Sequence, residues 1–146
     1  MKKPDWRSKR NIKWIEKHCK IPDGKFVGAA VKLRPWQKDE IRKIYDNPAG
    51  TRTAIMSFGR KNAKTTLSAF ILLLHLAGSE SKENSQLVST AQSRDQAAVI
   101  FELAAKIVRM SPTLHPVIGI RDSSKQMYCA ARGTTFKAMS AEAKTA

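Results

Sequence analysis

The sequence predicts an α/β fold, in which a parallel β-sheet is built from strands joined by crossover helices. Three observations predict it. Several segments repeat apolar residues at helical spacing. Short apolar runs rich in β-branched residues stand between these segments, so helices and strands alternate along the chain. The chain has 146 residues, of which 42% are hydrophobic, and this is enough for one domain with a buried core.

The helices are predicted from their apolar periodicity and from the signals at their ends. The first carries a ragged apolar stripe among basic residues, and Pro35 opens the second in its first turn. The third is apolar nearly all round and is expected to be buried. Ser93 or Asp95 can cap the fourth, which stops before Pro112. We expect helices over 1–20, 33–46, 64–76 and 93–110.

The strands are predicted from short apolar runs bounded by polar or glycine-containing turns. The run at 52–57 is expected to be a buried strand, and the run at 86–90 a second strand before the last helix. A short extended segment is expected over 26–33, ahead of the second helix. The remaining strands are expected over 117–120, 126–130 and 134–139.

The charge of the chain is strongly basic and unevenly distributed. Twenty-seven Lys and Arg residues against twelve Asp and Glu give a net charge of +15, and residues 1–64 hold 18 basic and 6 acidic residues, or +12 of it. Such a surface favours a polyanion, although a merely solubilising surface is the alternative. Two distant cysteines argue against zinc and a disulfide framework and are consistent with a reducing cytoplasm. The apolar run at 67–77 is about half of a membrane span, so we expect a cytoplasmic protein with no membrane partner.

One stretch, GRKNAKTT at 59–66, lies between a predicted strand and a predicted helix. A phosphate-binding loop combines backbone N–H groups around phosphate oxygens, a lysine, and a hydroxyl that ligates Mg²⁺ at the start of a helix. Lys64 would supply the amine and Thr65 the Mg²⁺-ligating hydroxyl. The strict pattern G-x-x-x-x-G-K-[ST] places glycines at 58 and 63, where this chain has Phe58 and Ala63. Alanine is the smallest departure from glycine.

The sequence therefore predicts an ATP and Mg²⁺ site at this loop, with a basic turn as the alternative. Gln37 is predicted to bind the adenine, because a carboxamide matches the donor and acceptor at the adenine N6/N7 edge; an exposed helix residue is the alternative there. The other predicted nucleotide-binding residues are Phe58, Gly59, Arg60, Lys61, Asn62, Ala63, Lys64, Thr65 and Thr66.

Taken together, four segments resemble the N-terminal ATPase domain of the large terminase subunit of tailed, HK97-like phages. The resemblance covers about residues 30–145, and its specificity lies in the order and spacing of the segments. They are LRPWQ at 33–37, SFGRKNAKTT at 57–66, STAQSRDQA at 89–97 and GTTFKAMSAEAKT at 133–145.

The resemblance implies a P-loop NTPase-like fold in a motor that couples ATP hydrolysis to the movement of double-stranded DNA into a procapsid. It implies that Lys64 and Arg60 act as catalytic residues on the phosphates. It also implies a homo-oligomeric ring, with the small terminase subunit and the portal as partners and non-specific phosphate contacts to DNA. We expect residues 1–30 to form a basic helical segment and 31–146 a partial ATPase domain.

In that family an apolar strand ending in Asp-Glu (the Walker B acids), a coupling segment and a metal-dependent nuclease domain follow. None occurs here, so we expect a chain truncated before the acid that hydrolysis requires. The carboxylates that are present do not fit the role, which predicts nucleotide binding with negligible turnover. These carboxylates are Asp95, Glu102, Asp122 and Glu142. Two alternatives stay open: a helicase-like DNA-dependent ATPase, and a non-enzymatic basic DNA-binding module.

Overall fold

The structure is a computed structural model and describes residues 6–57 and 64–140. Within these ranges helices and strands follow one another as a mixed α/β chain, and the helices predicted at 64–76 and 93–110 begin and end within a residue of their predicted bounds. The elements are α1 (Trp6–His18), α2 (Pro35–Tyr45), α3 (Lys64–Leu76), β1 (Gln86–Ala91), α4 (Arg94–Met110), β2 (Gly119–Arg121), β3 (Gln126–Cys129) and β4 (Thr134–Ser140).

The four strands form one sheet in the order β1-β4-β3-β2. β1 and β4 are parallel, as predicted, and the long connection between them contains α4. The β4–β3 and β3–β2 pairs are antiparallel, so the sheet is mixed. Short turns separate β2, β3 and β4, and a short turn can join only antiparallel neighbours.

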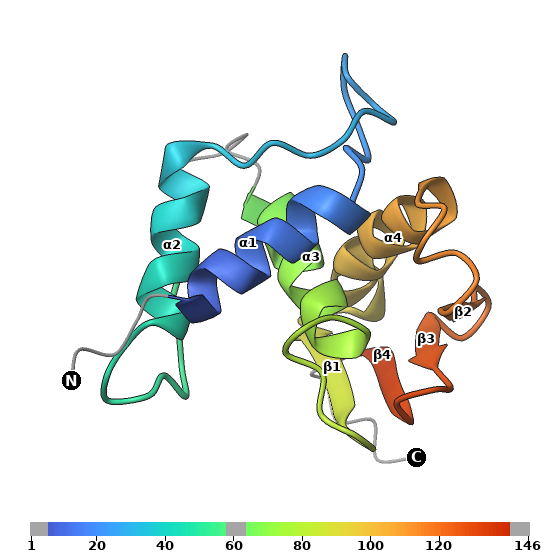
Figure 1. Cartoon of the computed structure of the whole chain (residues 1–146). Coiled ribbons are helices and arrows are strands. Elements are labelled where there is room, and N and C mark those ends of the chain that lie inside the picture. Colours follow the sequence, from blue (N-terminus) through green and yellow to red (C-terminus); the bar gives the residue numbers. More distant parts are fainter. Residues whose placement is uncertain (1–5, 58–63, 141–146) are drawn as a thin grey trace.

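Helices α3 and α4 lie side by side and cover one face of this sheet (Figure 1). The burial of β4 alternates accordingly: Phe136 and Ala138 are buried under the helices, whereas Lys137 and Met139 point to the opposite, exposed face. This period of two is the pattern of a strand with one covered face. Helix α1 packs on α2 and α3 at the other side of the molecule.

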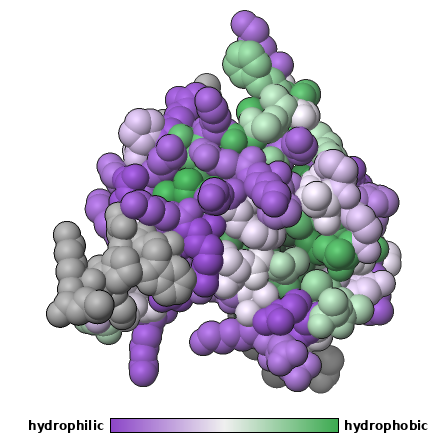
Figure 2. Space-filling view, in the orientation of Figure 1, coloured by the Kyte–Doolittle hydropathy of each residue, from purple (hydrophilic) through white to green (hydrophobic). Residues whose placement is uncertain are grey.

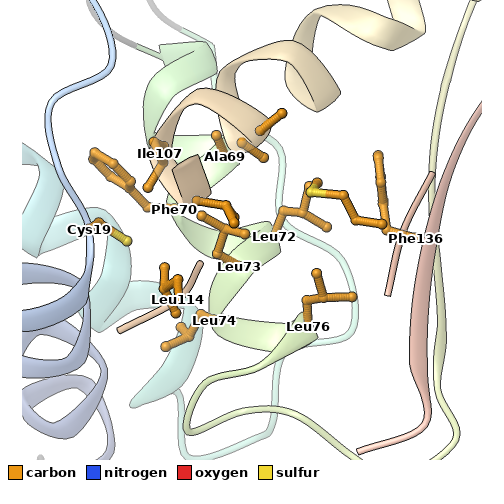
Figure 3. Packing of buried hydrophobic residues seen from close by; sticks show 14 of the residues in the cluster. Cys19, Ala69, Phe70, Leu72, Leu73, Leu74, Leu76, Ile107, Leu114 and Phe136 are labelled. Atoms are coloured by element: carbon orange, nitrogen blue, oxygen red, sulfur yellow. The ribbon is translucent and has the colours of Figure 1, made fainter. Parts of the chain in front are cut away.

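The core is centred on α3. Its leucines lie between Cys19 of the N-terminal segment and Phe136 of β4, and Ile107 of α4 packs beside them (Figure 3). Leu73 is fully buried. Because α3 contacts α1 on one side and the sheet and α4 on the other, most of its surface is apolar and only Lys64, Ser68 and His75 form a narrow polar line. Burial also raises the pKa of the Cys19 thiol to about 12, so this cysteine behaves as an apolar core residue. The predicted division of the chain into a basic helical segment over 1–30 and a partial ATPase domain over 31–146 stays a prediction.

The prediction of a buried strand over 52–57 is wrong. Residues 51–57 form no strand, and Ile55 is 90% exposed. A hollow separates this segment from β1: Ala54 and Met56 line one wall, and Leu87 of β1 lines the other. An apolar run becomes a strand only when a neighbouring strand satisfies its backbone groups. Among the described residues no strand pairs with this segment or with the outer edge of β1.

The extended segment expected over 26–33 is also different in the structure. Backbone hydrogen bonds between 21 and 29 close a turn, and Lys20 and Ala30 form an isolated β-bridge at its base. Gly24 and Gly28 have φ of +93° and +89°, a conformation that glycine adopts without strain. This loop, called here the 21–30 loop, follows α1 and precedes α2 along the chain, and it projects from the top of the molecule in Figure 1. None of the described helices is long and apolar enough to cross a membrane.

Candidate nucleotide-binding site

Helix α3 begins at Lys64, within the predicted phosphate-binding stretch at 59–66. Lys64 is exposed, and Thr65 and Thr66 are half-buried. The first backbone N–H groups of a helix have no partner within the helix, and they carry the positive end of its dipole. The first turn of α3 therefore favours an anion. The predicted residues Phe58, Gly59, Arg60, Lys61, Asn62 and Ala63 lie outside the described residues.

Two hollows flank this first turn, one on each side of α3. The first has a volume of about 560 Å³ and lies between α3, β1 and α4. Lys64, Thr65 and Ser68 of α3 line it, and its other polar side chains come from Ser89 and Thr90 of β1 and Gln96 of α4. The last three residues belong to STAQSRDQA, the third of the motifs quoted above. The polar part of the lining is therefore one ammonium group with hydroxyl and carboxamide groups, which suit phosphate oxygens, and the Ser89 hydroxyl donates to the carbonyl of Ala97 at 2.9 Å. Apolar side chains, among them Val99 and Ile100, complete the lining.

The second hollow has a volume of about 270 Å³ and lies between α3, α2 and the 21–30 loop. Thr66 of α3 and Gln37 of α2 both line it, so the structure brings the predicted adenine-binding residue to the helix that follows the loop. Phe70 and Val31 are buried in its floor and wall. Phe26 lines it from the 21–30 loop. We call this hollow the Gln37 pocket.

Gln37 is held in one orientation at the start of α2. Its Oε1 accepts a hydrogen bond of 2.8 Å from the backbone N–H of Arg34, which satisfies one of the free donors at the helix N-terminus. The side chain is buried, with 6% exposed. Because Oε1 must face this N–H, the assignment of oxygen and nitrogen in the carboxamide is fixed. Nε2 has no hydrogen-bond acceptor among residues 6–57 and 64–140.

The predicted carboxylates lie away from both hollows. Asp95 is exposed in the first turn of α4, Glu102 accepts a hydrogen bond of 2.9 Å from Lys125, and Asp122 pairs with Arg109. Glu142 is outside the described residues. The described part of the chain therefore places no carboxylate in the wall beside Lys64. It also holds no cluster of three or more His, Cys, Asp or Glu side chains that could bind a metal ion.

Sequence reasoning missed Phe26 and the hollow around it. The pattern G-K-F-V-G at 24–28 carried a usable signal, because two glycines four residues apart indicate a turn that presents the residues between them. Ser89, Thr90 and Gln96 lie within the motif STAQSRDQA at 89–97, which by itself assigns none of them to the phosphates. Their convergence on Lys64 depends on the packing of β1 and α4 against α3, which no local pattern reveals.

Comparisons with known proteins agree with the mixed α/β fold described above. Residues 35–144 match the family model for the ATPase domain of the terminase large subunit. Over 139 residues the chain is 48% identical to the terminase large subunit of Enterobacteria phage HK97, covering 95% of this chain and 28% of that protein. The crystal structure of the HK97 bacteriophage large terminase superimposes with a TM-score of 0.86 at 46% identity, over 96% of this chain and 28% of that one. The chain thus spans little more than a quarter of the length of these relatives.

Proposed function

This chain belongs to the terminase large subunit family through its ATPase domain, and from that premise we propose that it is the ATP-binding part of a motor that packages phage DNA. The observation that carries the proposal is that Gln37 lines the same pocket as Thr66 in the first turn of α3. Two residues predicted independently, one for the base and one for the phosphates, flank the same helix N-terminus. The proposal assigns the base to the Gln37 pocket and the phosphates to the neighbourhood of Lys64 and Thr65.

Each of these side chains has a role that follows from its chemistry. Lys64 neutralises charge on the outer phosphates, and the N-terminus of α3 adds its positive dipole end. The Thr65 hydroxyl would hold Mg²⁺, which would supply further neutralisation of phosphate charge. Gln37 orients the base. Arg60 is proposed to contact the phosphates as well, from the loop outside the described residues. Since electrostatics and positioning dominate phosphoryl transfer, this part of the site binds and aligns ATP.

Turnover by the 146-residue chain alone is proposed to be negligible. Hydrolysis requires a group that orients the attacking water, and no carboxylate of the described residues lines the hollow beside Lys64. ATP–Mg²⁺ titration tests the function by calorimetry, with Lys64→Ala as the test variant and Lys43→Ala, an exposed lysine at the end of α2, as its control. We expect binding by wild type and Lys43→Ala, and binding at least about tenfold weaker in Lys64→Ala. Equal binding by both variants contradicts the proposal.

Double-stranded DNA is the proposed polyanionic partner. The net charge of +15 supports contacts to phosphates, which carry no sequence information. Binding to short duplexes of unrelated sequence is expected to be equal among sequences and to weaken linearly on a log–log plot against salt. A strong preference for one duplex sequence contradicts this part of the proposal. The small terminase subunit, the portal, a homo-oligomeric ring and the host cytoplasm are proposed for the whole protein on the family relationship alone.

A further inference from the structure

We propose that Phe26 stacks on the adenine ring of the bound nucleotide and, together with Gln37, makes the Gln37 pocket selective for adenine. This inference rests on the proposed nucleotide-binding function and deepens it. It assigns a residue of the N-terminal segment, before the part of the chain that matches the ATPase family model at 35–144, to the nucleotide site.

Backbone hydrogen bonds fix the 21–30 loop, and the side chain of Phe26 on this loop is exposed. The N–H of Gly28 donates to the carbonyl of Ile21 at 2.8 Å, and the N–H of Ile21 donates to the carbonyl of Ala29 at 2.9 Å. The N–H of Ala29 also donates to the carbonyl of Phe26 itself at 3.0 Å. These bonds close the loop, yet Phe26 is 64% exposed. The ammonium of Lys25 lies 5.7 Å from the centroid of the Phe26 ring, and the rest of this apolar ring stays in water unless a partner covers it.

The loop projects from the surface in Figure 1, and the space-filling view shows hydrophobic surface on this projection, among largely hydrophilic surroundings (Figure 2). Phe26 contributes to the wall of the Gln37 pocket, whereas its exposed neighbour Val27 does not. The aromatic side chain therefore belongs to the pocket, and the neighbouring apolar side chain serves as a natural comparison within the same loop.

The composition of the pocket fits a purine base. Phe26 and the buried Phe70 supply apolar surface, and Gln37 and Thr66 supply polar groups at one side. Binding sites for flat heterocycles combine these features, because the faces of the base are apolar and its edge forms hydrogen bonds. Lys25, Lys32 and Arg34 also line the pocket, against one acid, Asp23, which pairs with Lys106 at 2.9 Å. The excess positive charge suits a ligand that carries phosphates.

The fixed orientation of Gln37 gives the pocket its preference among bases. The Nε2 group is a donor that matches N7 of a purine, and the second lone pair of Oε1 can accept from the N6 amino group of adenine. Guanine has an acceptor, O6, where adenine has the N6 amino group. Its N7/O6 edge therefore presents two acceptors, and O6 would face the acceptor Oε1 of Gln37 without a hydrogen bond. Stacking on Phe26 would hold the base in the plane in which this edge reaches Gln37.

The test compares a ligand that has a base with one that has none. ATP and inorganic tripolyphosphate, each with Mg²⁺, are titrated calorimetrically into wild type, Phe26→Ala, Phe26→Trp and Val27→Ala. We expect Phe26→Ala to bind ATP about tenfold more weakly, which corresponds to ~1.4 kcal/mol, and to bind tripolyphosphate as wild type does. Phe26→Trp should restore ATP binding, and Val27→Ala should leave both ligands unaffected.

The other outcomes separate this inference from the function on which it rests. Unchanged ATP binding by Phe26→Ala overturns the stacking role and leaves the nucleotide site standing. An equal loss for both ligands in Phe26→Ala also overturns it, because the residue would then act on the phosphate side or on the fold. If wild type binds neither ligand, both the proposed function and the stacking role are wrong.

Discussion

The guanidinium of Arg7 and the carboxylate of Glu80 form a two-point contact between residues that are 73 positions apart, with Nε–Oε2 and Nη2–Oε1 distances of 2.8 and 2.7 Å. Arg10 and Asn11 also donate to Oε2, at 3.0 and 2.9 Å. Glu80 lies just after α3, and the three donors lie on α1. The contact therefore ties the N-terminal helix to the end of the helix whose first turn carries Lys64.

Breaking this contact should destabilise the fold. Glu80 is buried, with 8% exposed, so removal of its carboxylate removes the acceptor that Arg7, Arg10 and Asn11 share. We expect Glu80→Ala to lower the free energy of unfolding by ~2 kcal/mol, less than for a fully buried pair because both arginines are half exposed. Arg42→Ala breaks only the surface pair with Asp39 and should cost less than ~0.5 kcal/mol. Urea unfolding measures both variants, and equal losses would contradict the anchoring role.

Stability should fall as the pH falls, because of Glu80 and His75. Burial opposes ionisation of Glu80, but hydrogen bonds from Arg7 and Asn11 and the charges of Arg7 and Arg10 outweigh it and lower the pKa of Glu80 from 4.5 to about 2. Burial likewise lowers the pKa of His75, which hydrogen-bonds to Tyr45 through Nε2 at 2.7 Å. In both cases the unfolded chain binds protons more readily, so acid favours unfolding.

The contribution of Glu80 is fully present above pH 4.5 and is lost between 4.5 and about 2, while that of His75 begins to be lost below its ordinary 6.5. Thermal unfolding across this range measures both. Glu80→Gln should be less stable than wild type at neutral pH, yet lose less stability than wild type between pH 4.5 and 2. Parallel pH profiles for the two proteins would show that Glu80 does not carry the acid sensitivity.

Local patterns predicted the helices well because the residues that decide them are close in sequence. Ser93 caps α4 by accepting from the N–H of Gln96 at 3.2 Å, and Pro35 opens α2 at its first position. The strand predicted over 52–57 failed because a strand depends on a partner that lies elsewhere in the chain. Its apolar residues indicated burial, but Ile55 is 90% exposed where no partner strand is present among the described residues.

The sequence predicted single residues of the candidate site but not the pocket that they form together. The sequence pointed to Gln37 and Lys64 separately, because each belongs to a recognisable short motif. The Gln37 pocket needs the 21–30 loop, whose path depends on positive φ at Gly24 and Gly28 and on a bridge between Lys20 and Ala30. Such long-range placement is set by packing, so the pattern at 24–28 predicts a turn that presents Phe26 but not its position in the same pocket as Gln37.

Thr65 should make nucleotide affinity depend on Mg²⁺. Thr65→Val removes the hydroxyl and keeps the shape of the side chain, so we expect the gain in ATP affinity from added Mg²⁺ to disappear. Thr65→Ser retains the hydroxyl and should preserve the gain. Thr65 is half-buried in the first turn of α3, and neither change should alter the fold. Calorimetric titration with Mg²⁺ and with EDTA gives the comparison. A full Mg²⁺ effect in Thr65→Val would remove Thr65 from the metal site.

Gln37 has two roles that a single substitution can separate. Its Oε1 caps α2 through the N–H of Arg34, and its Nε2 is the proposed donor to adenine N7. Gln37→Glu keeps the capping acceptor at a position where helices favour glutamate, so its thermal stability should match wild type. Gln37→Leu removes the cap and should lose ~1 kcal/mol.

The donor role is tested with 7-deaza-ATP, which lacks the N7 acceptor. Wild type should bind ATP about tenfold more tightly than 7-deaza-ATP, the worth of one hydrogen bond in a closed site. Gln37→Glu has no donor, so it should bind the two nucleotides equally, and more weakly than wild type binds ATP. The comparison between the two ligands within one variant cancels the added negative charge. If Gln37→Glu still prefers ATP over 7-deaza-ATP as strongly as wild type does, the base does not present N7 to Gln37, and Gln37 serves only as the cap of α2.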